Sequence, residues 1–319
     1  MKKNYLLVCL IFLFACGSDT KQQDKKLEVV KDYLLADNYV AKLVAQNHEK
    51  IKDTKGDFAS FKTYVDKLPN DSLVSIAYAL DYLNNCNLTN DSTKNSAYMV
   101  FRAHFYVAMN ELSTVLDTKY KFLLDVLAKD STTTELAYFK NNLAACGVGI
   151  FSTEGNFYVD ELPYYFYDTF KDRVPAETKE YLAIHADELK KGFSEDAGLL
   201  ISFDELYNRI KKWEAFMAKY PNSTYTKELK LTNALYIETL LTGMDNSRLF
   251  NFDSNTLLPE IKTLYEKIMK DDPASATTKI VTSYYNILAR HDFNQNDSLD
   301  IFLKANDLTS MLGVQPPTR

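Results

Sequence analysis

Glycine and proline are scarce in this sequence. The 319 residues include nine glycines and eight prolines, whereas average usage in proteins is about 7% and 5%. Sheets, turns and flexible linkers depend on these two residues, so their scarcity favours helices that are joined by short loops. We therefore predict an all-α fold built from antiparallel helical hairpins.

The chain also lacks a basic run. Its 43 acidic residues outnumber its 37 lysines and arginines, which gives a formal net charge of −6 at pH 7. Nucleic acids and anionic lipid surfaces attract proteins through clusters of positive charge. We therefore expect no nucleic-acid partner.

Recognisable catalytic and metal-binding motifs are missing as well. The sequence contains no G-x-S-x-G elbow, no Walker loop and no dinucleotide fingerprint. The histidines are scattered and form no H-E-x-x-H motif or i, i+4 pair: His48, His104, His185 and His291. We predict no metal, no cofactor and no catalytic residue, and the sequence favours a protein that is not an enzyme.

The N-terminal residues have the pattern of a bacterial export signal. Two lysines precede an apolar run over residues 5–14, which is too short to span a bilayer as a mature helix. Residues 13–16, Leu-Phe-Ala-Cys, then resemble the lipobox of bacterial lipoproteins. The resemblance implies that residues 1–15 are a signal peptide and that Cys16 is lipidated and becomes the new N-terminus.

The residues after the lipobox indicate in which membrane the protein would be anchored. Gly17 follows the cysteine where an aspartate would imply retention at the inner membrane, so the resemblance to lipoproteins implies an outer-membrane anchor. Residues 16–23 would be a short lipidated tether. Each buried CH₂ of the acyl chains contributes about 0.8 kcal/mol, which anchors a protein without a spanning helix. Whether the body faces the periplasm or the cell surface stays open.

Two cysteines remain in the body of the chain, Cys86 and Cys146. An envelope location permits a disulfide between them. The alternative is a pair of buried thiols that act as small apolar residues, and we favour it. Their spacing matches no metal motif.

Three regions follow the tether. We predict an N-terminal helical subdomain over residues 24–146, an aromatic-rich connecting segment over 147–175 and a C-terminal helical subdomain over 176–319. Three glycines lie at the start of the connecting segment, and apolar residues flank Glu154-Gly155-Asn156. This pattern predicts a small β-hairpin or a structured loop.

The connecting segment also holds the best candidates for ligand binding. Tyrosine offers a flat apolar face and a hydroxyl group, which suit stacking on a sugar or holding a peptide, and nearby charged groups could supply hydrogen bonds. The alternative is that these rings form the core where the two halves meet. The candidates are Tyr158, Tyr164, Tyr165, Tyr167, Glu154, Asp160 and Arg173.

The last third contains an internal repeat. Residues 213–223 match residues 265–275 at a constant offset of 52, and each copy is a helical pattern that ends at a Pro-x-Ser turn, around Pro221 and Pro273. The match resembles the junction of a tetratricopeptide repeat, although that family repeats at about 34 residues. The excess falls in the insertion over residues 243–259. Residues 193–202 and 241–246 are in addition similar to uncharacterised bacterial envelope proteins, and this resemblance points to no particular mechanism.

We predict an outer-membrane-anchored, non-catalytic binding or scaffold lipoprotein that mediates protein interactions in the cell envelope. Its partners would be the lipid bilayer, through the acyl anchor, and another envelope protein or a peptide. Two alternatives stay open. One is a sugar- or peptide-binding lipoprotein in nutrient uptake, which would use the tyrosines. The other is a hydrolase of envelope polymers, which would use Glu154, Asp160 and Glu161.

The lipobox resemblance gives the first prediction. In cells fed a clickable fatty acid, the wild-type chain should carry the label and fractionate with the outer membrane. Cys16→Ser should abolish the label, because the acyl chains need the thiol. Cys9→Ser is the matched control, since Cys9 leaves with the signal peptide, and it should keep the label. Equal labelling of both variants would contradict the assignment.

Overall fold

The computed structural model describes residues 33–308, so the predicted signal peptide, Cys16 and the tether lie outside the described residues. Between residues 33 and 308 the chain forms thirteen α-helices, one 3₁₀ helix and two small antiparallel strand pairs. The prediction of a mainly helical fold with a small β element is confirmed. No helix among these described residues is long and apolar enough to cross a membrane.

The N-terminal half is organised around one long helix, α5, of 29 residues. The Asn90 side chain caps it by accepting a hydrogen bond from the Thr93 backbone N–H at 2.9 Å, which satisfies one of the free donors of the first turn. The elements of this half are η1 (Tyr33–Leu35), α2 (Tyr39–Ile51), α3 (Phe58–Val65), α4 (Val74–Asn84), α5 (Asp91–Lys119), α6 (Lys121–Leu127) and α7 (Thr134–Ala145).

The centre begins with a β-hairpin. Thr153 pairs with Asn156, and between them Glu154 and Gly155 have φ values of 48° and 79°. Two successive residues in the left-handed conformation form a two-residue turn whose twist matches that of the flanking strands. The predicted hairpin is therefore confirmed. The central elements are β1 (Val148–Thr153), β2 (Asn156–Glu161), α8 (Tyr165–Phe170), α9 (Ala176–Lys191), β3 (Ser194–Glu195) and β4 (Gly198–Leu199).

The C-terminal half contains two helical hairpins and a final helix. The 52-residue offset relates buried positions in the two hairpins: Trp213 matches Tyr265, and Tyr236 matches Leu288. The insertion between the hairpins forms no helix and is held by isolated bridges, among them Phe250 to Leu257. The helices are α10 (Phe203–Lys219), α11 (Thr226–Thr242), α12 (Pro259–Asp271), α13 (Ala276–Arg290) and α14 (Asp297–Ala305).

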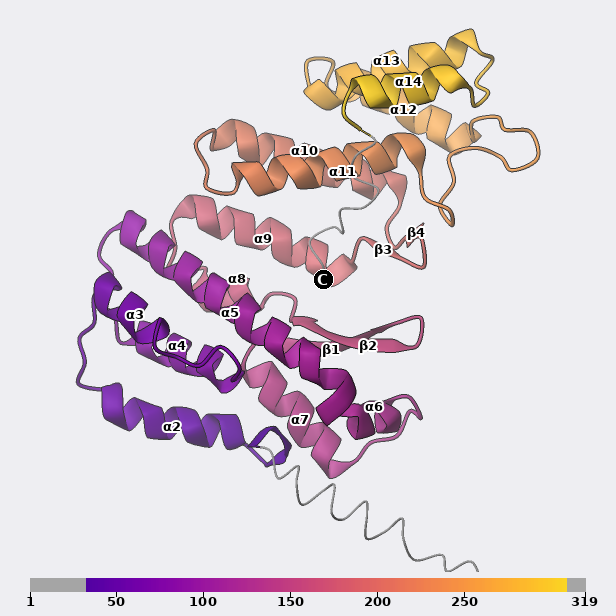
Figure 1. Cartoon of the computed structure of the whole chain (residues 1–319). Coiled ribbons are helices and arrows are strands. Elements are labelled where there is room, and N and C mark those ends of the chain that lie inside the picture. The colour runs from indigo at the N-terminus through magenta and orange to yellow at the C-terminus, as the bar shows by residue number, and fades with distance from the viewer. Residues whose placement is uncertain (1–32, 309–319) are drawn as a thin grey trace, which may run out of the picture.

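These elements form layers that follow the chain order only in part, because α7 returns to pack beside η1 and α2 (Figure 1). Helices α2, α3 and α4 lie at one end and α12, α13 and α14 at the other. Helix α5, the β1–β2 hairpin and α9 lie between them, so the middle of the chain is also the middle of the molecule.

Aromatic rings from the connecting segment pack on α5. Phe166 and Phe170 are almost fully buried, and the Phe166 ring lies edge-on to Phe105 with the centroids 4.8 Å apart. Gly147, with φ 81°, lets the chain pass over Tyr165, because a Cβ here would lie 2.4 Å from that ring. These rings therefore belong to the core that joins the two halves.

Cys86 and Cys146 are free thiols in the structure. Cys146 is fully buried, and the Cys86 thiol donates to the Tyr82 carbonyl oxygen with the heavy atoms 3.4 Å apart. Burial raises the pKa of Cys86 to about 11 and that of Cys146 to about 12. Both side chains therefore stay protonated at neutral pH, and the structure does not join them in a disulfide.

The aromatic core gives the second prediction. Phe166→Ala should lower the free energy of unfolding by about 3–5 kcal/mol, because it removes a buried ring and leaves a cavity among its neighbours. Phe252→Ala is the control, since that ring is 76% exposed, and it should change stability by less than about 0.5 kcal/mol. Chemical denaturation followed by circular dichroism measures both. Similar losses in the two variants would contradict this packing.

Candidate functional site

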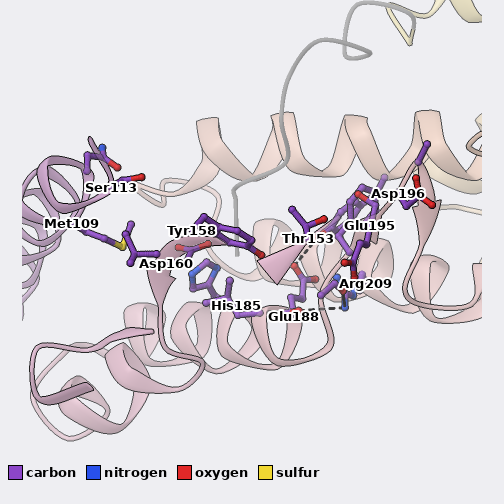
Figure 2. Close-up of a pocket in the computed structure, with 18 residues that line it drawn as sticks. Met109, Ser113, Thr153, Tyr158, Asp160, His185, Glu188, Glu195, Asp196 and Arg209 are labelled. Atoms are coloured by element: carbon purple, nitrogen blue, oxygen red, sulfur yellow. Dashed lines mark hydrogen bonds between the residues drawn. The ribbon is translucent and has the colours of Figure 1, made fainter. Parts of the chain in front are cut away.

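A cleft opens where the two halves of the molecule meet. It has a volume of about 580 Å³, within the range of small-molecule sites. The cleft is lined by side chains from both halves, namely from α5, β1, β2, α9, α10, α11 and the β3–β4 loop. Figure 2 shows Met109 and Ser113 at one end, Glu195 and Asp196 at the other.

Helix α9 supplies two ionisable groups to the cleft. His185 and Glu188 lie three residues apart and share one face of α9. They lie between the hairpin residue Asp160 and Arg209 of α10 (Figure 2). The same face of the helix is anchored by the buried apolar side chains of Leu182 and Leu189.

Arg209 lines the cleft at the end of α9, on the side of Glu195 and Asp196 (Figure 2). Its side chain is only 1% exposed, and its Nη2 donates to the Gly192 carbonyl oxygen at 2.7 Å. A cation at the C-terminus of a helix interacts favourably with the helix dipole and with free carbonyl groups. Arg209 therefore fixes the point where the chain turns from α9 into β3.

Glu188 is held through only one of its oxygens. Its Oε2 accepts a hydrogen bond from the Tyr236 hydroxyl at 2.9 Å, whereas Oε1 is buried without a hydrogen-bond partner among residues 33–308. Burial raises the pKa of Glu188 above its usual value, although Arg209 and Tyr236 act in the opposite direction. The nearby Trp213 indole N–H also favours the ionised form, but it does not reach hydrogen-bond geometry.

His185 forms an ion pair with a buried carboxylate behind the cleft wall. Its Nε2 lies 3.3 Å from Oε1 of Glu161, and the other Glu161 oxygen accepts a short hydrogen bond from the Tyr106 hydroxyl. Burial alone would lower the pKa of His185, but the charge and hydrogen bond of Glu161 raise it above the usual value. Glu161 therefore stabilises the protonated imidazole relative to the neutral one.

A second ion pair ties the two halves together beside this cleft. Arg102 on α5 donates from Nη1 and Nη2 to the two carboxylate oxygens of Glu228 on α11, at 3.2 and 3.1 Å. The Tyr181 hydroxyl donates to the same carboxylate at 2.8 Å. Burial raises the pKa of Glu228, but the charge and hydrogen bonds of Arg102 together with the Tyr181 hydrogen bond outweigh it and hold the pKa below its usual value. The pair joins residues 126 positions apart.

Two of the residues predicted as ligand contacts line the cleft. Tyr158 and Asp160 lie on β2 and face it (Figure 2). Glu154 is exposed at the hairpin turn. Arg173 is also exposed and donates to Asn84, beside a separate hollow of about 340 Å³.

The three tyrosines after Pro163 lie apart from the cleft lining. The Tyr165 ring stacks on Phe105 with the centroids 5.7 Å apart, as part of the core. The Tyr164 hydroxyl donates to Asp187 at 2.5 Å, and Tyr167 contacts the Tyr164 ring edge-on. The structure thus divides the predicted tyrosines: Tyr158 lies in the cleft wall, Tyr165 and Tyr167 pack against the core, and Tyr164 lies at the surface.

The cleft residues that were not predicted as ligand contacts from the sequence include His185, Glu188, Arg209 and Tyr236. A signal for three of them is nevertheless present. His185 and Glu188 share a helical face with buried Leu182 and Leu189, and Arg209 adjoins buried Ile210. Ionisable residues on an apolar helix face are costly unless paired, so they mark positions with a specific role.

Comparison with known proteins identifies no relative of this chain. No protein-family model matches the chain, and neither a curated protein nor a solved structure is significantly similar to it. In the part of the chain that the structure describes, no three side chains of the metal-ligating kinds cluster as a metal site. The function therefore has to be argued from the cleft.

The His185–Glu161 pair gives the third prediction. Because the folded-state pKa of His185 is raised, its stabilising effect is complete below the unfolded pKa of about 6.5 and is lost as pH rises through the folded pKa. Each unit of increase in pKa corresponds to about 1.4 kcal/mol. Urea unfolding at several pH values above 6 should show this decline in the wild type.

Two variants isolate the histidine. His185→Gln should remove that part of the pH dependence, whereas His291→Gln should keep it, because His291 is exposed. An unchanged pH profile in His185→Gln would show that the pair does not contribute.

Proposed function

We propose that the protein is an outer-membrane-anchored, non-catalytic binding lipoprotein of the cell envelope, which holds a partner in its central cleft. The observation that carries the proposal is the cleft itself. Its walls come from both halves of the chain, and its volume of about 580 Å³ suits a ligand group or a short peptide segment.

The polar side chains of the cleft are held in place by other residues, and this supports a binding function. His185 is held by Glu161, Arg209 by the Gly192 carbonyl and Tyr236 by Glu188. A site whose side chains are already positioned loses little conformational entropy when a ligand arrives. The side chains of the cleft are therefore held in position by the protein itself, which supports a binding role.

The helical hairpins of the C-terminal half support a scaffold role. The α10–α11 and α12–α13 hairpins are similar to tetratricopeptide hairpins in their Pro-x-Ser turns and their buried aromatic positions, at an offset of 52 residues. Stacked helical hairpins present extended surfaces to partner proteins. A lipidated Cys16 would hold this surface at the membrane, facing the periplasm or the cell exterior.

Two other functions deserve separate tests. A sugar- or peptide-binding role in nutrient uptake is favoured by Tyr158, whose ring lies in the cleft wall. A hydrolase of envelope polymers would need two carboxylates that face one bond. Glu161 instead lies buried behind the wall and binds His185, so Asp160 and Glu161 do not form such a pair.

Site-specific photo-crosslinking in native envelopes tests the proposal and is the fourth prediction. A photoreactive benzoylphenylalanine at Ser113, an exposed residue in the cleft lining, should give a discrete adduct. The same group at Thr114 is the matched control, because the next residue on a helix points about 100° away and Thr114 is exposed outside the cleft lining. It should give no such adduct.

Two results would contradict the proposal. One is the absence of any adduct from position 113 in intact envelopes. The other is the same adduct from both positions, which would place the partner outside the cleft.

A further inference from the structure

We propose that the cleft binds an organic cation, an ammonium or guanidinium group at the end of an aliphatic stem. The inference rests on the proposed binding function and names the chemistry of the ligand. A basic peptide side chain and a free alkyl amine both present this group, and the experiment below separates them.

The charge balance of the cleft is negative. Acidic side chains in the lining outnumber basic ones by four to two: Asp160, Glu188, Glu195 and Asp196 against His185 and Arg209. Each of these two basic groups has a partner in the protein, although the Arg209 Nε is buried without a hydrogen-bond partner among the described residues. His185 pairs with Glu161 at 3.3 Å, and Arg209, 1% exposed, donates to a backbone carbonyl. An entering ligand therefore meets a surplus of carboxylates.

Glu188 provides a specific acceptor within this surplus. Its Oε1 is buried and has no hydrogen-bond partner among the described residues. A buried acceptor without a partner carries a desolvation cost that a ligand N–H would relieve. Burial also raises the pKa of this carboxyl, which shows that the surrounding protein leaves its negative charge incompletely compensated.

Aromatic and apolar side chains of the cleft would surround the aliphatic stem of the ligand. Phe193 and Tyr236 line the cleft with ring centroids 5.1 Å apart, and Tyr158 lies in the wall formed by β2. Aromatic faces attract cations and also cover methylene groups. Met109 and Leu189 add apolar surface. Carboxylates beside aromatic rings are the combination that suits an alkyl ammonium or guanidinium group.

The test, our fifth prediction, compares a cation with its neutral isostere. Calorimetry on the full mature chain should show N-acetylarginine amide binding at least tenfold more tightly than N-acetylcitrulline amide, which keeps the shape and lacks the charge. The affinity should fall as salt rises. Binding by 1,5-diaminopentane instead of the capped arginine would identify the free amine as the source of the cation.

Matched variants locate the site. Glu188→Gln keeps the size of the side chain and should weaken cation binding at least tenfold. Asp117→Asn, which removes an exposed carboxylate of α5 outside the cleft lining, should leave it unchanged. Because a buried substitution can impair folding, the double variant Glu195→Gln, Asp196→Asn on the β3–β4 loop gives a second measure, and it should also weaken binding. Circular dichroism confirms that each variant is folded.

The outcomes separate the two proposals. Equal affinity for the cation and its neutral isostere, or no effect of either set of cleft variants, would overturn the cation assignment. If the Ser113 adduct still forms, the binding function survives that result. Absence of both the adduct and cation binding would overturn both.

Discussion

The arrangement of this molecule depends on a two-point ion pair between its halves. Arg102 and Glu228 meet through two hydrogen bonds, and the Tyr181 hydroxyl donates to the same carboxylate. A guanidinium–carboxylate pair of this kind fixes direction as well as distance, because both groups are planar. It sets the position of α11 relative to α5, with α9 between them. The cleft is lined by these same three helices, so its shape follows from this pair.

Stability and orientation have different sources at this junction. The rings of Phe166 and Phe170 bury against α5 and supply apolar contact, which has little directional preference. Desolvation of an ion pair offsets much of its attraction, so a pair such as Arg102–Glu228 adds less to stability than to a defined geometry. Glu161 acts in the same way, since it connects Tyr106 of α5 to His185 of α9. The aromatic core holds the halves together, and the polar contacts define how they meet.

Local features of the sequence predicted the architecture well. Scarce glycine and proline indicated helices, Glu154-Gly155 indicated the hairpin turn, and the offset of 52 predicted paired helical hairpins. The cleft could not be predicted this way, because Glu188 and Tyr236 are 48 residues apart and meet only after folding. Composition also could not separate Tyr165, a core ring, from Tyr158, a cleft ring. That distinction depends on which neighbour covers each ring.

The position of Glu188 connects the fold to the proposed function. A carboxylate with a buried, unpartnered oxygen and a raised pKa lowers the stability of the folded state at neutral pH. An apolar side chain of similar size would avoid that cost. Where a sequence departs from what stability favours, a functional site is the expected reason. A bound cation would supply both the missing charge and the missing donor, and so would make the unfavourable Glu188 carboxylate a point of recognition in the cleft.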